Sequence, residues 1–132
     1  MNKLVWSADM SVGHDELDRQ HQVIINLINQ LIDIQNSSFD KEALRDVSSE
    51  LVKYSMEHLK YEEDLLQANA YPEFNKHKLE HFSYVQKTTK NLKNALNLDE
   101  SCLNEMVEFL SDWWTRHILE EDMKYKDFLL QI

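Results

Sequence analysis

The sequence has one glycine and one proline among its 132 residues. Turns depend heavily on these two residue types, so their scarcity argues against a β-rich fold with its many turns. Cys102 is the single cysteine, which excludes an internal disulfide and leaves no thiolate cluster to hold zinc or an iron–sulfur cluster. We interpret Cys102 as a small, buried apolar residue.

Long apolar runs and clusters of basic residues are also missing. No stretch approaches the ~20 apolar residues that span a bilayer, and the first ten residues include Lys3 and Asp9 instead of a continuous apolar signal segment. The formal net charge of -10 repels polyanions such as DNA and RNA. We therefore expect a cytoplasmic, monomeric protein without a membrane or nucleic-acid partner.

Hydrophobic residues make up 42% of the chain and recur at helical spacing. The pattern predicts helices at about residues 18–36, 40–68, 73–95 and 100–129, after an extended arm at about 1–16. Asp40 is a candidate N-cap. Breaks are expected at Asn36-Ser37-Ser38, Ala70-Tyr71-Pro72 and Asn97-Leu98-Asp99. Short connections favour a single domain, 1–132, with an all-α fold: an up-down-up-down antiparallel four-helix bundle.

Five of the six histidines fall on predicted inward faces, and each predicted helix carries at least one. Residues four apart on a helix are about 40° apart around its axis, so such pairs can point at the same spot. A lone histidine on an apolar face is more often a hydrogen-bonded core residue, but burying this whole set without a metal would leave many polar groups unpaired. The seven candidate metal ligands are His21, His58, Glu62, His77, His81, His117 and Asp122.

The spacing of His117 and Asp122 needs a distortion of the helix. Five residues on an ideal helix are about 140° apart. Both side chains can reach one centre only if the helix loosens between them. We predict a π-bulge or an equivalent distortion here, because such bulges gather at functional sites.

Imidazole and carboxylate ligands suit iron, manganese, zinc and copper. Seven ligands are too many for one tetrahedral zinc ion. They fit two metal ions if Glu62 and Asp122 each bridge through both oxygens. With a solvent oxygen shared by both metals, one of about twelve octahedral positions stays open for a small ligand.

Several segments spread over nearly the whole chain match a known family. They are Trp6, Ser11-Val12-Gly13, Leu17-Asp18-Arg19-Gln20-His21, His58-Leu59-Lys60-Tyr61-Glu62-Glu63, Tyr71-Pro72, His77-Lys78-Leu79-Glu80-His81 and Trp113-Trp114-Thr115-Arg116-His117-Ile118, with Asp122 and Tyr125. In these segments the sequence resembles the hemerythrin family, in particular its single-domain bacterial members.

The resemblance implies a non-haem di-iron centre that binds O2 reversibly. It assigns His77, His81 and His117 to one iron. His21 and His58 would hold the other iron, which keeps the open position. Glu62, Asp122 and a solvent-derived oxo or hydroxo group would bridge the two. An unknown reductase or O2-consuming partner would act with the protein.

A dry apolar pocket should protect the irons from oxidation. The candidates for its walls are Ile24, Ile25, Ile28, Leu110, Trp113 and Trp114, although ordinary core packing explains the same residues. Trp114 departs from the family, which usually has leucine at this position. The indole is larger than a leucine side chain, so it could narrow the entry path or shield the bound oxygen. It also brings an N–H donor, which could hydrogen-bond to that oxygen.

Other polar residues lie outside the ligand pattern. His14 also departs from the family, and we interpret it as a non-ligand. Tyr61, Glu63 and Tyr125 are close to ligands in sequence and are candidates for supporting contacts. The alternative is that Glu63 is solvated and that the tyrosines only pack.

Four functions remain open. The first is O2 binding without catalysis, for storage, delivery or sensing. The second is a di-iron enzyme: an oxidase, a peroxidase or a nitric oxide reductase. Carboxylate-rich di-iron sites in bundles use Glu-x-x-His pairs, and the predicted inward faces carry none, so histidine-rich ligation favours binding. The third is a regulatory module that acts on a separate partner protein. The fourth is a site that holds zinc.

Overall fold

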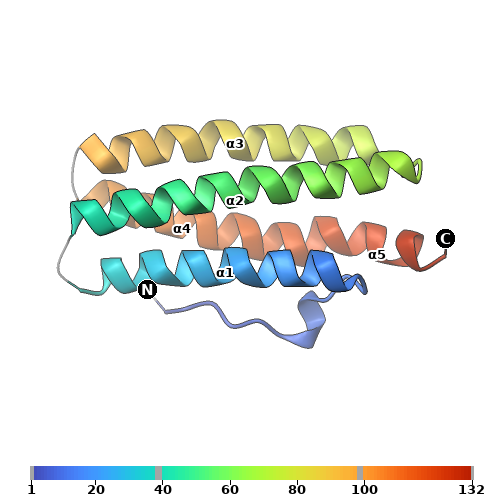
Figure 1. Ribbon diagram of the computed structural model, residues 1–132, viewed down its shortest axis with the longest axis horizontal. Coiled ribbons are helices and arrows are strands. Elements are labelled where there is room, and N and C mark those ends of the chain that lie inside the picture. Colours follow the sequence, from blue (N-terminus) through green and yellow to red (C-terminus); the bar gives the residue numbers. More distant parts are fainter. Residues whose placement is uncertain (1, 38–39, 98–99, 132) are drawn as a thin grey trace.

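The chain folds into four antiparallel helical rods, as the computed structural model shows for residues 2–37, 40–97 and 100–131 (Figure 1). The first three rods are α1 (Asp15–Gln35), α2 (Lys41–Ala68) and α3 (Phe74–Asn97). The fourth consists of α4 (Glu100–Arg116), the π-helical segment η2 (His117–Asp122) and α5 (Met123–Leu130). Each rod contacts both of its neighbours around the bundle. The predicted all-α, up-down-up-down bundle is confirmed.

Local capping explains where two helices begin. The prediction that the first helix starts near residue 18 is wrong, because α1 already begins at Asp15 with His14 as its N-cap. The His14 Nδ1 accepts the backbone N–H of Leu17 at 3.2 Å, which satisfies one of the free donors of the first turn. The predicted start of α2 is confirmed, with Asp40 accepting two backbone N–H groups of that helix.

The other predicted boundaries hold to within two residues where the structure describes them. The third helix extends to Asn97, past the expected end near 95. The fourth rod ends at Leu130, one residue after the expected end. The breaks expected at Ser38 and at Leu98-Asp99 lie outside the described residues.

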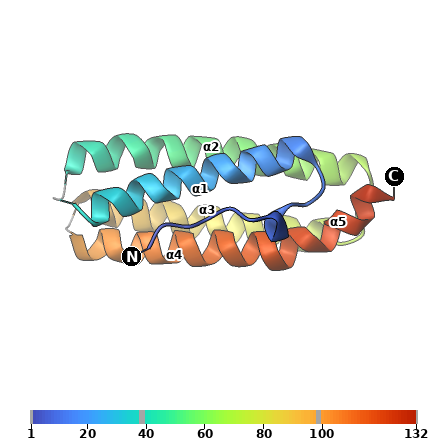
Figure 2. The same ribbon diagram turned by 90° about the horizontal axis from the view of Figure 1, so that it is seen from below.

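The N-terminal arm runs along the bundle beside α1 and α4 (Figure 2). Its backbone at Leu4 exchanges two hydrogen bonds with the Asn29 side chain, at 2.7 and 2.9 Å. The arm is not extended throughout, because a short 3-10 helix, η1 (Ala8–Met10), interrupts it. Gly13 turns the chain into α1 with a φ of 74°, a conformation that favours glycine.

Two apolar clusters fill the bundle. The larger one includes Ile24, Leu59 and Ile118, and the partly buried Cys102 packs against it instead of being fully buried. The smaller one includes Leu17, Leu66 and Tyr125.

Between the two clusters, the helices carry polar residues. His21 lies between Leu17 and Ile24, and Glu62 lies between Leu59 and Leu66. A polar layer therefore interrupts the core. In the described parts of the chain, no helix is both long and apolar enough to cross a membrane.

Candidate metal centre

All seven predicted ligands come together in the polar layer of the bundle. Each is buried, with at most 3% of its surface exposed. Their ligand atoms form two groups in which the atoms lie within 4.8 Å of one another. The first group is Glu62, His77, His81, His117 and Asp122, and the second is His21, His58 and Glu62.

Glu62 belongs to both groups. One of its oxygens, Oε1, contacts the Nε2 atoms of His77 and His81, the latter at 3.1 Å. The other, Oε2, faces the Nε2 atoms of His58 at 3.4 Å and His21 at 3.7 Å. The carboxylate therefore presents one oxygen to each histidine group.

The two carboxylate oxygens of Asp122 also face different histidines. Its Oδ1 lies 3.0 Å from the Nε2 of His117 and 3.2 Å from that of His77. Its Oδ2 lies 3.1 Å from the Nε2 of His21. Two buried carboxylates thus separate three histidines from two, an arrangement in which both can bridge a pair of metal ions.

The helix carrying His117 and Asp122 is distorted between these residues. Residues His117–Asp122 form a π-helix, while the flanking residues are α-helical. The wider π turn brings two residues that are five apart onto the same face. The predicted π distortion is confirmed.

Outer contacts orient three of the histidines. In each case Nδ1 lies near a side-chain oxygen that can accept its proton, and this contact turns Nε2 toward the centre. These pairs are His58 with Gln20 at 2.7 Å, His81 with Glu63 at 3.1 Å and His117 with Glu80 at 3.4 Å. The contact suggested for Glu63 is confirmed, whereas Gln20 and Glu80 were not anticipated.

The two tyrosines proposed for supporting contacts differ. Tyr125 is fully buried and its hydroxyl donates to Glu62 Oε2 at 3.0 Å. Burial raises the pKa of Tyr125 well above its usual value, so it stays a donor. Tyr61 is 38% exposed and its ring lies edge-on to His14, 6.3 Å away, so it packs at the surface.

The surrounding histidines lower the pKa values of both carboxylates in the site. Burial alone would raise the pKa of Glu62, but hydrogen bonds from the surrounding histidines outweigh burial and hold it well below its usual value. The pKa of Asp122 is likewise low, because His117 and His21 outweigh burial and the charge of Glu62. Without a metal, the layer therefore contains two carboxylates neutralised by protonated histidines.

Several buried atoms of the layer lie in histidine–carboxylate contacts but make no hydrogen bond in the described structure. They include His21 Nε2, His58 Nε2 and both carboxylate oxygens of Asp122. Buried polar atoms are normally paired, so this cluster has unmet ligand capacity. The donor set is nitrogen and carboxylate oxygen, which suits iron and related ions. The residues present therefore fit a pair of metal ions.

Comparison with known proteins identifies the family. The model of the hemerythrin HHE cation binding domain matches residues 12–129. The chain belongs to the hemerythrin family.

Relatives agree with this assignment, and a solved structure shares the fold. The chain is 32% identical to a bacteriohemerythrin of Clostridium acetobutylicum, over 93% of this chain and 98% of that protein. A bacteriohemerythrin of Stenotrophomonas maltophilia is also 32% identical, over 96% of this chain and 82% of the relative. A crystal structure of wild-type hemerythrin superposes with a TM-score of 0.81 and 24% identity, covering 96% of this chain and 97% of the other.

Five of the six predicted pocket-wall residues of this hemerythrin-family chain are buried in the larger apolar cluster: Ile24, Ile25, Ile28, Leu110 and Trp114. The Trp114 ring lies 5.7 Å from that of His58 and 6.5 Å from that of His21. Trp114 therefore lies over the side of the layer that has two histidines, and its ring is also 6.2 Å from that of His117.

Trp113 has a different position from the other proposed wall residues. It is partly exposed and stacks on the ring of His117, with 4.3 Å between ring centroids and 13° between the planes. It thus lies on the side of the layer that has three histidines.

Proposed function

We propose that this chain binds O2 reversibly at a di-iron centre and that it is an oxygen carrier or store without catalytic activity. Hemerythrins bind O2 at a non-haem di-iron centre. The observation that carries the proposal is the division of both carboxylates between three histidines and two. His77, His81 and His117 would hold one iron, His21 and His58 the other, with Glu62 and Asp122 as bridges.

The iron pair supplies the electrons that reversible O2 binding requires. The contribution of the chain is to fix its ligands and keep water away. Three Nδ1 contacts fix imidazole orientation, and the Tyr125 hydroxyl fixes Glu62. The two-histidine side offers fewer protein ligands, so we place the open position there, beneath Trp114.

The composition of the site favours binding over catalysis. The layer has five histidines and two carboxylates, whereas bundle oxygenases use carboxylate-rich sets with Glu-x-x-His pairs. Zinc fits less well, because a structural zinc ion takes four ligands and this layer offers seven.

Anaerobic reduction followed by O2 addition and removal tests the proposal. We expect about two irons per chain, as the ligand count requires, and a visible charge-transfer band that appears with O2 and disappears on deoxygenation. Prompt, irreversible conversion to the diferric form would point to an enzyme or a redox sensor. Turnover of peroxide or nitric oxide would contradict the non-catalytic part, and failure to bind iron would contradict the whole proposal.

A further inference from the structure

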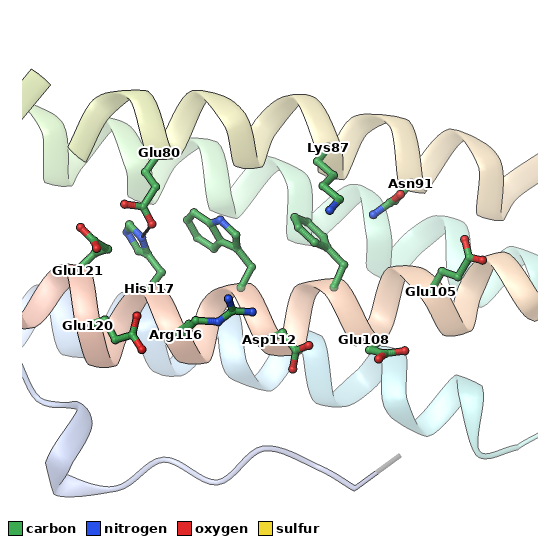
Figure 3. A pocket seen from close by; sticks show the side chains of 12 residues that line it. Glu80, Lys87, Asn91, Glu105, Glu108, Asp112, Arg116, His117, Glu120 and Glu121 are labelled. Carbon is green, nitrogen blue, oxygen red and sulfur yellow. Dashed lines mark hydrogen bonds and ion pairs between the residues drawn. The ribbon is translucent and has the colours of Figure 1, made fainter. Parts of the chain in front are cut away.

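One candidate iron ligand is in close contact with an aromatic ring that reaches the surface. The indole of Trp113 stacks almost parallel on the His117 imidazole, and both residues line a surface cavity of about 570 Å³ between α3 and α4. Figure 3 shows His117 pointing toward Glu80 across this cavity. The centroid of the Trp113 ring also lies 4.3 Å from that of Tyr84 and 5.0 Å from that of Trp114. The stack therefore joins the solvent to the metal layer through two rings.

The cavity is strongly acidic. Arg116 and Lys87 are its basic residues, and Lys87 lies over the Phe109 ring at 4.7 Å. Six carboxylates line the same space: Glu80, Glu105, Glu108, Asp112, Glu120 and Glu121. A cleft lined by one sign of charge concentrates ligands of the opposite sign. A cation is therefore drawn to the place where the indole meets solvent.

The other side of the layer is closed. All five histidines are nearly fully buried, but Trp114, next to His21 and His58, is 0% exposed, whereas Trp113, next to His117, is partly exposed. Electrons that enter at Trp113 would reach the three-histidine side without crossing the space we assign to O2. This separation distinguishes the cavity from the ligand pocket.

We propose that this cavity is an electron-entry site, where a positively charged one-electron donor docks against Trp113 and its electron passes through the stacked rings to His117. The inference rests on the proposed di-iron function. Two donor molecules, each oxidised by one electron, supply the two electrons that return two ferric ions to the ferrous state. Such encounters are brief and use small interfaces, so steering by charge matters more than area.

Docking can be tested on the metal-free protein with oxidised methyl viologen, a dication that quenches indole fluorescence. We expect quenching of the wild-type protein that weakens as salt is added. W113F should lose this salt-sensitive component and keep the emission of Trp6 and Trp114. Iodide, an anion, should quench the same component poorly.

Electron transfer can be tested by stopped-flow reduction of the oxidised, iron-loaded protein with the methyl viologen radical cation. At low salt, E108Q/D112N should slow reduction by about tenfold, within the range by which charge steering changes association rates. The matched pair E50Q/E57Q removes the same charge from exposed positions on α2 and should leave the rate unchanged. W113L should lose the fast phase, while W113F, which keeps a ring against His117, should retain it.

Specific results would overturn the inference. The first is a rate of iron reduction that does not depend on salt. The second is an equal rate for E108Q/D112N and E50Q/E57Q, and the third is salt-sensitive quenching that persists in W113F. If W113L does not fold, the E108Q/D112N rate and the W113F quenching still decide. Failure to take up iron would remove the proposed function and this inference together, whereas loss of reversible O2 binding alone would leave both measurements valid.

Discussion

The indole N–H of Trp114 donates a hydrogen bond to the hydroxyl of Tyr84 at 3.0 Å, and both side chains are buried. The Tyr84 hydroxyl also lies 3.1 Å from Ser55 Oγ, so it can donate to the serine while it accepts from the indole. The N–H that the sequence offered as a donor to bound oxygen is therefore already paired. The indole presents a ring, held at a fixed angle, to the histidines beneath it.

Replacing Tyr84 with phenylalanine should destabilise the protein. The substitution leaves the buried Trp114 N–H without an acceptor, which costs about 1–3 kcal/mol. Urea unfolding of the metal-free protein, followed by tryptophan fluorescence, measures this loss. Tyr61→Phe is the control, because Tyr61 is partly exposed. Equal stability of the two variants would contradict the role assigned to Tyr84.

His14→Ala should weaken α1 without affecting iron. Loss of an N-cap acceptor costs about 0.5–2 kcal/mol, and the His14 Nδ1 accepts the N–H of Leu17 instead of facing the metal layer. Thermal unfolding and iron analysis measure the two effects separately. His21→Ala, which lies on the same helix, should instead reduce iron content. An iron deficit in His14→Ala would show that the assignment is wrong.

Glu62→Gln should disrupt the metal pair while preserving the shape of the side chain. An amide offers one neutral oxygen where the carboxylate faces both histidine groups. We expect iron content to fall below the roughly two ions per chain that the ligand set predicts. Iron analysis after reconstitution provides the measurement. Glu120→Gln, at an exposed position within the π segment, is the control and should keep its iron.

The metal-free protein should lose stability as the pH rises from about 6.5 toward 10. Burial lowers the pKa values of His21 and His77, but Asp122 and Glu62 outweigh it and raise both to about 9. The pKa of His117 rises to about 10, chiefly through the charge of Asp122 against burial. A group whose pKa is higher in the folded than in the unfolded protein contributes its full stabilisation below its unfolded-state pKa. That contribution is lost as the pH rises past its folded-state pKa.

Urea unfolding at a series of pH values checks this trend, and a flat profile between pH 6.5 and 10 would contradict it. Glu62 and Asp122, whose pKa values are lowered, act in the opposite direction: their contribution is lost only in strong acid. Metal ligation needs unprotonated imidazoles, so iron uptake should release protons and strengthen with rising pH. A pH electrode in unbuffered solution measures that release.

The sequence was sufficient for the parts of the site that follow from position along a helix. His58 with Glu62, and His77 with His81, are one turn apart, and their convergence follows from helix geometry alone. The π segment could also be predicted, because the spacing of His117 and Asp122 does not fit an α-helix.

Contacts that depend on side-chain direction between helices could not be predicted. Gln20 and Glu80 each lie next to a ligand in sequence, and the need of a ligating histidine for an acceptor at Nδ1 was the available signal. The pairing of Tyr84 with Trp114 likewise depends on how α3 approaches α4. The start of α1 was missed because histidine is not among the preferred N-cap residues.

The π segment also sets the rotational phase of everything that follows it. Each residue of an α-helix advances the side-chain direction by about 100°, and the wide turn at His117–Asp122 takes up part of that advance. Tyr125 comes three residues later and reaches Glu62, while its ring meets Tyr71 edge-on at 6.3 Å. Insertion or deletion of one residue between 117 and 122 would therefore turn α5 and the aspartate together. The docking of the C-terminal helix and the ligand set of the metal layer are controlled by the same residue count.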